Sequence, residues 1–342
     1  MCAPAQFSSR AQSDSATHTA MHVLRAIVAA SSSFLAEPNL HLSFEREGLV
    51  RAVETHDTAR LYEWLLGVLS FQGISDTAAL SFMSEHGLPG WEQIAAFLET
   101  AACPKLVTHW NFSNCGFVRS HGSCNTPGHY GRCPVPALPL RNGSLNRMAF
   151  SLFLFLRDVC EGDLVGWIDR RLASVSHRGS DEYAHRLGQA LIQPMRGIHG
   201  ASDKVLNMAL SDFLIAVDPA RELWRLAGSH MVAIDSLVHN LLHRTGTLAE
   251  RGAEHAYGPT CYRPGKCADI VRQLAHEFDA RQLDPAFPEV FPRLVQHALW
   301  HFCAQDGFNI CNGMQIDDAL PCENGDCPVL EACGRFSLRA MA

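Results

Sequence analysis

Apolar side chains recur at helical spacing in several stretches of this chain, and that period constrains its fold more than any other feature. The clearest runs are Leu61–Leu69, Phe150–Leu156, Val205–Leu214 and Leu237–Leu242. Residues three and four positions apart share one face of an α-helix, whereas a half-buried strand alternates apolar and polar residues. The sequence therefore predicts an all-α fold, with two helical lobes and a cleft between them.

The length and the changes in composition along the chain suggest how it is organised. Its 342 residues are enough for two modest domains or for one large domain with insertions. Residues 1–20 are rich in small and polar residues and are predicted to form a flexible tail. We expect an N-terminal helical segment at 21–56, a helical core at 57–246 and a C-terminal helical lobe at 247–342. The core would contain a Cys/His-rich insertion at 103–140.

Charge and hydropathy exclude some classes of function. The net charge of −7 argues against broad, nonspecific binding to nucleic acid, although a local basic surface is compatible with it. No apolar run is long enough to span a membrane, and the N-terminus lacks the basic and apolar regions of a signal peptide. We therefore expect a cytoplasmic protein that does not associate with membranes.

The chain has 13 cysteines, and in a reducing compartment clustered cysteines indicate metal sites more often than disulfides. Four of them form the pattern C-x10-C-x4-C-x5-C near the C-terminus: Cys311, Cys322, Cys327 and Cys333. Four thiolates in one short loop suit a [4Fe–4S] cluster, and they would also suit zinc. Cys303 lies within a helical pattern, so we expect it to be a core thiol. Cys261 and Cys267, in C-Y-R-P-G-K-C, are assigned no role.

A second cysteine group lies in a loop rich in Gly and Pro. Cys115, Cys124 and Cys133 are evenly spaced there, and His129 lies between the last two. A metal would supply the core that such a polar loop cannot build for itself. We expect zinc bound by these three cysteines and His129. The alternative is an uncoordinated loop with its thiols tucked beneath it.

The candidate catalytic residues lie between residues 198 and 246. Gly200 lies in a tight turn between two helical patterns, where the absence of a Cβ lets a phosphate approach backbone N–H groups. Lys204 follows in the first turn of the next helix, and Asp235 begins a later helix. A lysine and an aspartate at two helix starts can act as nucleophile and charge partner in Schiff-base chemistry.

These segments resemble the helix-hairpin-helix DNA glycosylase superfamily, specifically its endonuclease III-like branch. That family has a hairpin L-P-G-V-G-x-K, then an aspartate helix ending in R-x-G, and finally a four-cysteine cluster loop. Gly200 and Lys204 take the hairpin positions in this chain, and Asp235 is followed by Arg244 and Gly246. The motifs occur in the family's order over most of the chain.

The resemblance also has departures. Ser202 stands where the family has its second hairpin glycine, and the interval from Lys204 to Asp235 is longer than in the family. Asp218 lies nearer the family's distance and is the rival aspartate. In the cluster loop only the last cysteine spacing is unchanged, although Gly307 precedes Cys311 by four residues, as in the family.

What the resemblance implies is a DNA base-excision glycosylase that also cleaves the strand as an AP lyase. A damaged or mispaired base would be flipped out of the duplex, because its glycosidic carbon cannot be reached inside the stack. Lys204 would form the Schiff base, and Asp235 would stabilise the positive charge that develops on the sugar. The enzyme would act as a monomer and carry the [4Fe–4S] cluster. The residues expected to contact DNA are Gln72, His199, Gly200 and Ser202.

Two other functions remain open. One is a non-catalytic DNA-binding or lesion-sensing protein on the same scaffold. The other is a metal-stabilised redox or interaction protein unrelated to DNA, whose affinity for a duplex would not depend on salt through phosphate contacts.

Overall fold

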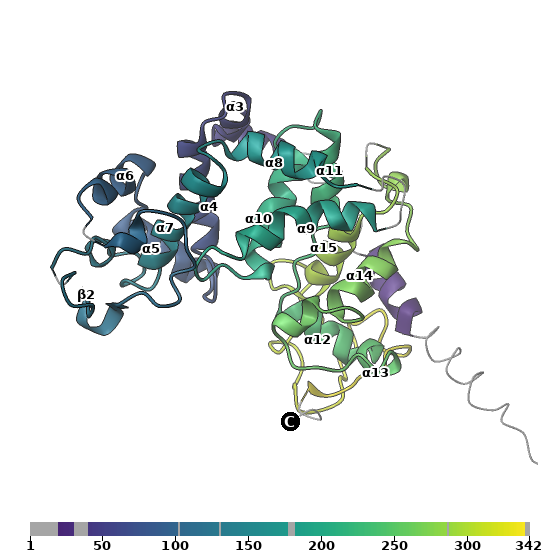
Figure 1. Ribbon diagram of the computed structural model, residues 1–342. Coiled ribbons are helices and arrows are strands. Elements are labelled where there is room, and N and C mark those ends of the chain that lie inside the picture. The colour runs from purple at the N-terminus through teal and green to yellow at the C-terminus, as the bar shows by residue number, and fades with distance from the viewer. Residues whose placement is uncertain are drawn as a thin grey trace, which may run out of the picture. The chain divides into compact units, whose positions relative to one another are not determined.

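The computed structural model describes residues 20–30, 40–101, 103–129, 131–176, 182–285 and 287–338. The chain divides into two compact units (Figure 1). The hairpin unit is Asn39–Gly228, and the terminal unit combines Met1–Pro38 with Ser229–Ala342. The boundaries predicted after residues 56 and 246 differ from those of the two units, which lie after Pro38 and Gly228. Residues 1–19 of the predicted tail lie outside the described residues.

A helix at residues 20–30 belongs to the same unit as the C-terminal part of the chain. Leu24 and Ile27 on this helix are fully buried. Arg25 forms an ion pair with Glu277, and Val28 borders an apolar pocket formed largely by the C-terminal part. Burial of this apolar helix face stabilises the terminal unit across a long sequence separation. A division read from sequence order alone therefore misses this grouping.

The hairpin unit is built mainly of helices with short connections. Its helices and strands, in order, are α2 (Leu40–Arg46), α3 (Leu49–Glu54), α4 (Thr58–Leu69), α5 (Asp76–His86), α6 (Trp91–Glu99), η2 (Pro104–Leu106), β1 (Phe117–Val118), η3 (Arg119–His121), β2 (Ser123–Cys124), η4 (Val135–Ala137), α7 (Asn146–Leu154), η5 (Phe155–Val159), α8 (Leu164–Ala173), α9 (Tyr183–Met195), α10 (Asp203–Ala216) and α11 (Glu222–Ser229).

Helix α4 is central to the core of the hairpin unit. The Asp57 side chain caps its first turn, and Leu61 and Leu65 are fully buried. The helix packs against α6, α7, α8 and α10, and its Trp64 stacks on Phe213 of α10 with ring centroids 4.7 Å apart. The helical period of the sequence thus marks the face that α4 buries.

The terminal unit places its helices around α15, which packs against both α12 and α14. Its helices after residue 229 are α12 (Ser236–Arg244), α13 (Thr247–Glu250), η6 (Pro259–Tyr262), α14 (Cys267–Ala275), η7 (Ala280–Gln282) and α15 (Pro292–Cys303). Residues 304–338 follow as turns, bends and irregular chain up to the last described residue.

The described residues are mostly helical, which confirms the all-α prediction at the level of class. Their one sheet has two strands, in which Phe117 pairs with Cys124 and Val118 with Ser123, antiparallel. No helix in the described ranges has both the length and the apolar character needed to cross a bilayer.

Candidate functional site

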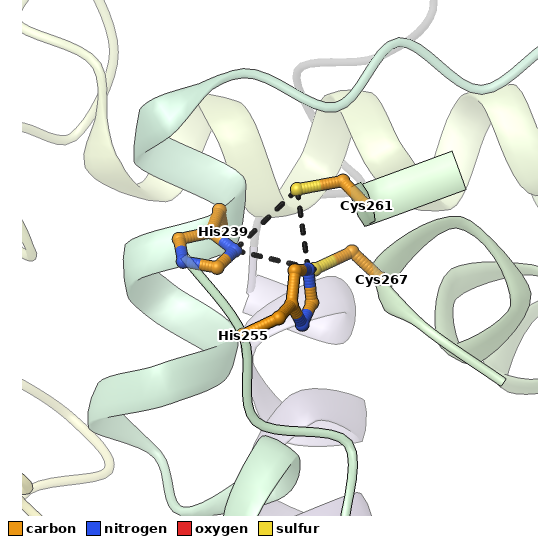
Figure 2. Close-up of side chains that lie close together, drawn as sticks. All are labelled: His239, His255, Cys261 and Cys267. Carbon is orange, nitrogen blue, oxygen red and sulfur yellow. Dashed lines mark hydrogen bonds between the residues drawn. The ribbon is translucent and has the colours of Figure 1, made fainter. Parts of the chain in front are cut away.

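Two histidines and two cysteines of the terminal unit converge in its interior (Figure 2). His239 lies on α12, His255 in the loop after α13, Cys261 in η6, and Cys267 is the first residue of α14. Their ligand atoms all lie within 4.8 Å of one another. We call these residues the His/Cys group. Among the described residues, no other such group of three or more His, Cys, Asp or Glu side chains is this compact.

The distances within the His/Cys group match the edges of a small tetrahedron. His239 Nδ1 lies 3.4 Å from Cys267 Sγ and 3.6 Å from Cys261 Sγ. His255 Nε2 lies 3.3 Å from Cys261 Sγ and 3.4 Å from Cys267 Sγ. Zinc bonds of about 2.0 Å to nitrogen and 2.3 Å to sulfur predict nitrogen–sulfur edges of about 3.5 Å. The group can therefore hold one metal ion with little rearrangement.

Hydrogen bonds orient the ligand atoms of the His/Cys group. His255 Nδ1 lies 2.6 Å from the carbonyl oxygen of Ala253, so a proton on Nδ1 leaves Nε2 free to face the two thiols. Metal-binding histidines commonly make this second contact to a carbonyl, which sets the tautomer and the ring orientation. His239, Cys261 and Cys267 are buried, and His255 is half-buried. A metal-binding role fits both the donor set and its surroundings.

The two thiols of the group are unequal. A hydrogen bond from Cys267, together with the bonds from His239 and His255, lowers the pKa of Cys261 despite its burial. The same hydrogen bond and burial raise the pKa of Cys267. One proton between two buried sulfurs thus stabilises one thiolate. A divalent cation in the same place would stabilise both thiolates, because thiols lose their protons on binding a metal.

Spacing alone did not identify this group. Cys261 and Cys267 are separated by five residues, which matches no common zinc-binding motif, and His239 lies 22 residues before Cys261. The available signal was the C-Y-R-P-G-K-C segment, in which two cysteines flank a turn. The fold supplies the histidines by packing the loop after α13 and the segment from η6 to α14 against α12.

The C-terminal cysteines predicted to bind a cluster also gather in one region. Burial, together with charge on Cys311, Cys327 and Cys322, raises the pKa of Cys333 to about 11. Burial also raises the pKa of Cys327, with added effects from Cys311 and Cys322. The His/Cys group, which is the one group of potential metal ligands that converges among the described residues, contains none of these four cysteines. The four thiols therefore share one region of the terminal unit.

Arg244, at the end of α12, connects this cysteine loop to the helices. Its buried guanidinium forms an ion pair with Asp318 and donates to the carbonyl oxygen of Cys311 at 3.4 Å. The thiol of Cys333 lies 3.6 Å from the carbonyl oxygen of Arg244. Cys303 is fully buried at the end of α15 and hydrogen-bonds to Cys311, which lowers the pKa of Cys311 to about 7 with help from Arg244.

In the hairpin unit, the predicted hairpin connects α9 to α10. Gly200 has a φ of 80°, a left-handed conformation that favours glycine. Ser202 precedes α10 without capping it through its side chain, and Arg196 pairs with Asp203 across the turn. Lys204 is the second residue of α10, as expected, and is half-buried.

Gln72 is bound to this hairpin. Its side-chain nitrogen donates to the carbonyl oxygen of Gly200, and its side-chain oxygen accepts from the N–H of Ser202 at 2.8 Å. His199 is held by Ser151, whose hydroxyl accepts from the His199 N–H at 2.9 Å, and by the carbonyl of Asn111, 3.0 Å from Nδ1. All four residues expected to contact DNA are thus brought together.

The two candidate aspartates have different partners. Asp235 caps α12, because its side-chain oxygen accepts from the N–H of Val238 at 2.9 Å. Asp218 pairs with Arg221 at 3.0 Å. Lys204 belongs to the hairpin unit and Asp235 to the terminal unit. That these two side chains face one cleft stays a prediction.

Comparison with known proteins identified no relative of this chain. No family model matches the chain, and no curated protein or solved structure gives a significant match. The likeness to DNA glycosylases therefore depends on the sequence motifs alone.

Proposed function

We propose that this protein is a DNA base-excision glycosylase with AP-lyase activity, and that bound metals stabilise its terminal unit. The observation that carries the proposal is the hairpin between α9 and α10. A left-handed Gly200, a lysine in the next helical turn and a glutamine from another loop meet there. A helix N-terminus with a close-approach turn is suited to a phosphate, which supports duplex DNA as the partner.

The chemistry follows from an amine close to a flipped nucleotide. Lys204 Nζ would bond to C1′ of the sugar while the glycosidic bond breaks, its electron pair leaving with the base. Loss of the amine protons and opening of the sugar ring would give the Schiff base. Removal of a C2′ proton would then expel the 3′ phosphate and cleave the strand. The carboxylate of Asp235 would stabilise the cationic sugar before the Lys204 bond is complete.

The metals have a structural role in this proposal. The His/Cys group offers four ligands and no open position, which is typical of structural zinc rather than catalytic zinc. The C-terminal cysteines would hold the predicted [4Fe–4S] cluster through Cys311, Cys322, Cys327 and Cys333. Four cysteine thiolates in one loop support a cluster, because a [4Fe–4S] cluster is held by four such ligands.

Borohydride trapping on a duplex with an abasic site tests the lyase step. We expect wild-type protein to be trapped covalently and Lys204→Gln to lose trapping while it keeps duplex affinity. Lys266→Gln, a change at a lysine outside the hairpin, is the matched control and should be trapped like the wild type. Wild-type protein that binds the duplex and is never trapped would contradict the lyase mechanism.

Asp235→Asn tests whether Asp235 stabilises the positive charge that develops on the sugar. Asparagine also caps helices, so we expect α12 to stay folded. Base release should slow by about 10²- to 10³-fold, the usual effect of removing one preorganised electrostatic partner. Asp218→Asn is the control. If Asp218→Asn slows base release and Asp235→Asn does not, the assignment of the aspartate is wrong.

A non-catalytic DNA-binding protein is the second candidate. Its support is that the Asp235 side chain already caps α12, a sufficient structural reason for an aspartate at that position. The trapping experiment separates the two, since a binding protein shows salt-dependent affinity for duplex DNA and forms no covalent adduct.

A further inference from the structure

Four cysteines of the hairpin unit line one small cavity. Cys103 lies just before η2, Cys115 before β1, Cys124 in β2 and Cys133 shortly before η4. The cavity also includes His129. We propose that these four thiols form a third metal centre, in which Cys103 supplies the fourth ligand in place of His129. The ligand class is a thiophilic metal, either zinc or an iron–sulfur cluster.

The backbone around the cavity is shaped to bring the sulfurs together. A Cβ at Gly116 would lie 3.0 Å from Cys124 Sγ and 2.3 Å from Thr126 Oγ1, so only glycine fits there. The N–H of Asn125 donates to the carbonyl of Gly116 at 2.8 Å and continues the pairing of β1 and β2. Two strands of two residues are too short to be stable alone. A bound metal would supply the missing stabilisation, as it does in small metal-binding domains.

Lys105 also lines this cavity, but its amine is held by other partners. It donates to the carbonyl oxygen of Asn114 at 2.9 Å and lies over the Trp110 ring.

The centre also supports the hairpin. The loop between Cys103 and Cys115 contacts the hairpin through the Asn111 carbonyl, which lies 3.0 Å from His199 Nδ1. The buried ring of Phe112 lies 6.2 Å from the His199 ring. A Cβ at Gly197 would lie 3.1 Å from His109 Nε2, so the loop also lies directly against the chain before the turn. A metal that orders this loop would therefore also hold the hairpin in place.

The test measures zinc, iron and acid-labile sulfide in full-length protein purified without oxygen. We expect Cys103→Ser to lose one centre relative to wild type, which means one zinc ion or about four irons. His129→Ala should keep it, as should Cys160→Ser, a change at a buried thiol outside the three groups. Loss of zinc identifies a zinc site, and loss of iron with sulfide identifies a cluster. If His129→Ala loses the metal and Cys103→Ser keeps it, the ligand assignment is overturned.

A second measurement keeps the proposal testable if Cys103→Ser does not fold. Alkylation of the wild-type protein, mapped by mass spectrometry, should leave all four thiols protected until a chelator is added and should then modify all four. Free alkylation of Cys103 while the other three stay protected would overturn the proposal. Hydrogen exchange at residues 197–202 should rise in Cys103→Ser where that variant folds. None of these measurements requires DNA, so they are independent of the proposed glycosylase activity.

Discussion

The His/Cys group and the C-terminal cysteine loop lie in the same unit and share helix α12, yet they are built differently. His239 and Cys267 extend from helices, and the ligand atoms of their group lie within 4.8 Å. Cys322 and Cys327 extend from irregular chain after the last helix. Helices can position ligands before a metal binds, whereas a loop depends on the metal for its own order.

Burial differs in the same way. Cys261 and Cys267 are fully buried, whereas the four C-terminal thiols are half-buried. Loss of the first metal would leave buried polar groups without a partner inside the core, which is costly. Loss of the second would leave its thiols partly in contact with water. We therefore expect the first site to determine folding of the terminal unit and the second to affect mainly the loop.

The largest effect is expected from Cys267→Ser in the His/Cys group. It should remove one zinc ion and lower the free energy of unfolding by more than about 4 kcal/mol, since loss of a metal ranks among the most destabilising single changes. Thermal unfolding and metal analysis measure both quantities. His276→Ala, at an exposed histidine beyond α14, is the control. A variant that loses no zinc and keeps its stability would show that the group is not a metal site.

A smaller loss of stability is expected from Cys322→Ala in the C-terminal loop. Absorbance at about 400 nm and the bound iron should disappear, because the cluster needs all four thiolates. Helix content should change little, since the loop contributes no helix among the described residues. Cys303→Ala is the control and should keep the cluster. If Cys322→Ala keeps the cluster and Cys303→Ala loses it, then Cys303 is a cluster ligand and Cys322 is not.

Arg244→Met tests how α12 connects the two sites. The change removes the ion pair with Asp318 and the hydrogen bond to Cys311. Because Asp318 is about half exposed and can be solvated, we expect a cost of about 1–3 kcal/mol rather than that of a fully buried pair. Iron should dissociate faster from the loop, while zinc in the His/Cys group should be unaffected. Equal loss of both metals would mean that α12 itself unfolds.

The smallest effect is expected from pH at His243, which lies between His239 and Arg244 on α12. Burial lowers the pKa of His243, with further lowering from His239 and Arg244. Its folded pKa is below the unfolded value, so this contribution to stability is present above about pH 6.5 and is lost as pH falls. His243→Leu should weaken the pH dependence of unfolding between pH 7 and pH 5. If the pH dependence of unfolding is the same in His243→Leu as in the wild type, it comes from the metal ligands and not from His243.

The sequence by itself determined the helical class, the hairpin and the clustering of cysteines. Apolar residues at helical spacing leave few alternatives to helices that bury one face, as in α4. Local constraints also act at Gly200 and Gly307. Gly200 has a φ of 80°, which favours glycine, and Gly307 has no room for a Cβ. A Cβ at Gly307 would lie 2.1 Å from the carbonyl oxygen of His301. Such local constraints can be read from spacing, since they act within a few residues.

Only the tertiary structure decided which side chains meet. His239 and His255 lie beside Cys261 and Cys267 because separate segments pack against α12. Cys103 lines one cavity with Cys115, Cys124 and Cys133, although it is not part of their even spacing in the sequence. The N-terminal helix joins the terminal unit for the same reason. These groupings depend on the burial of apolar faces between segments far apart in the chain, and a periodic pattern identifies such a face without identifying its partner.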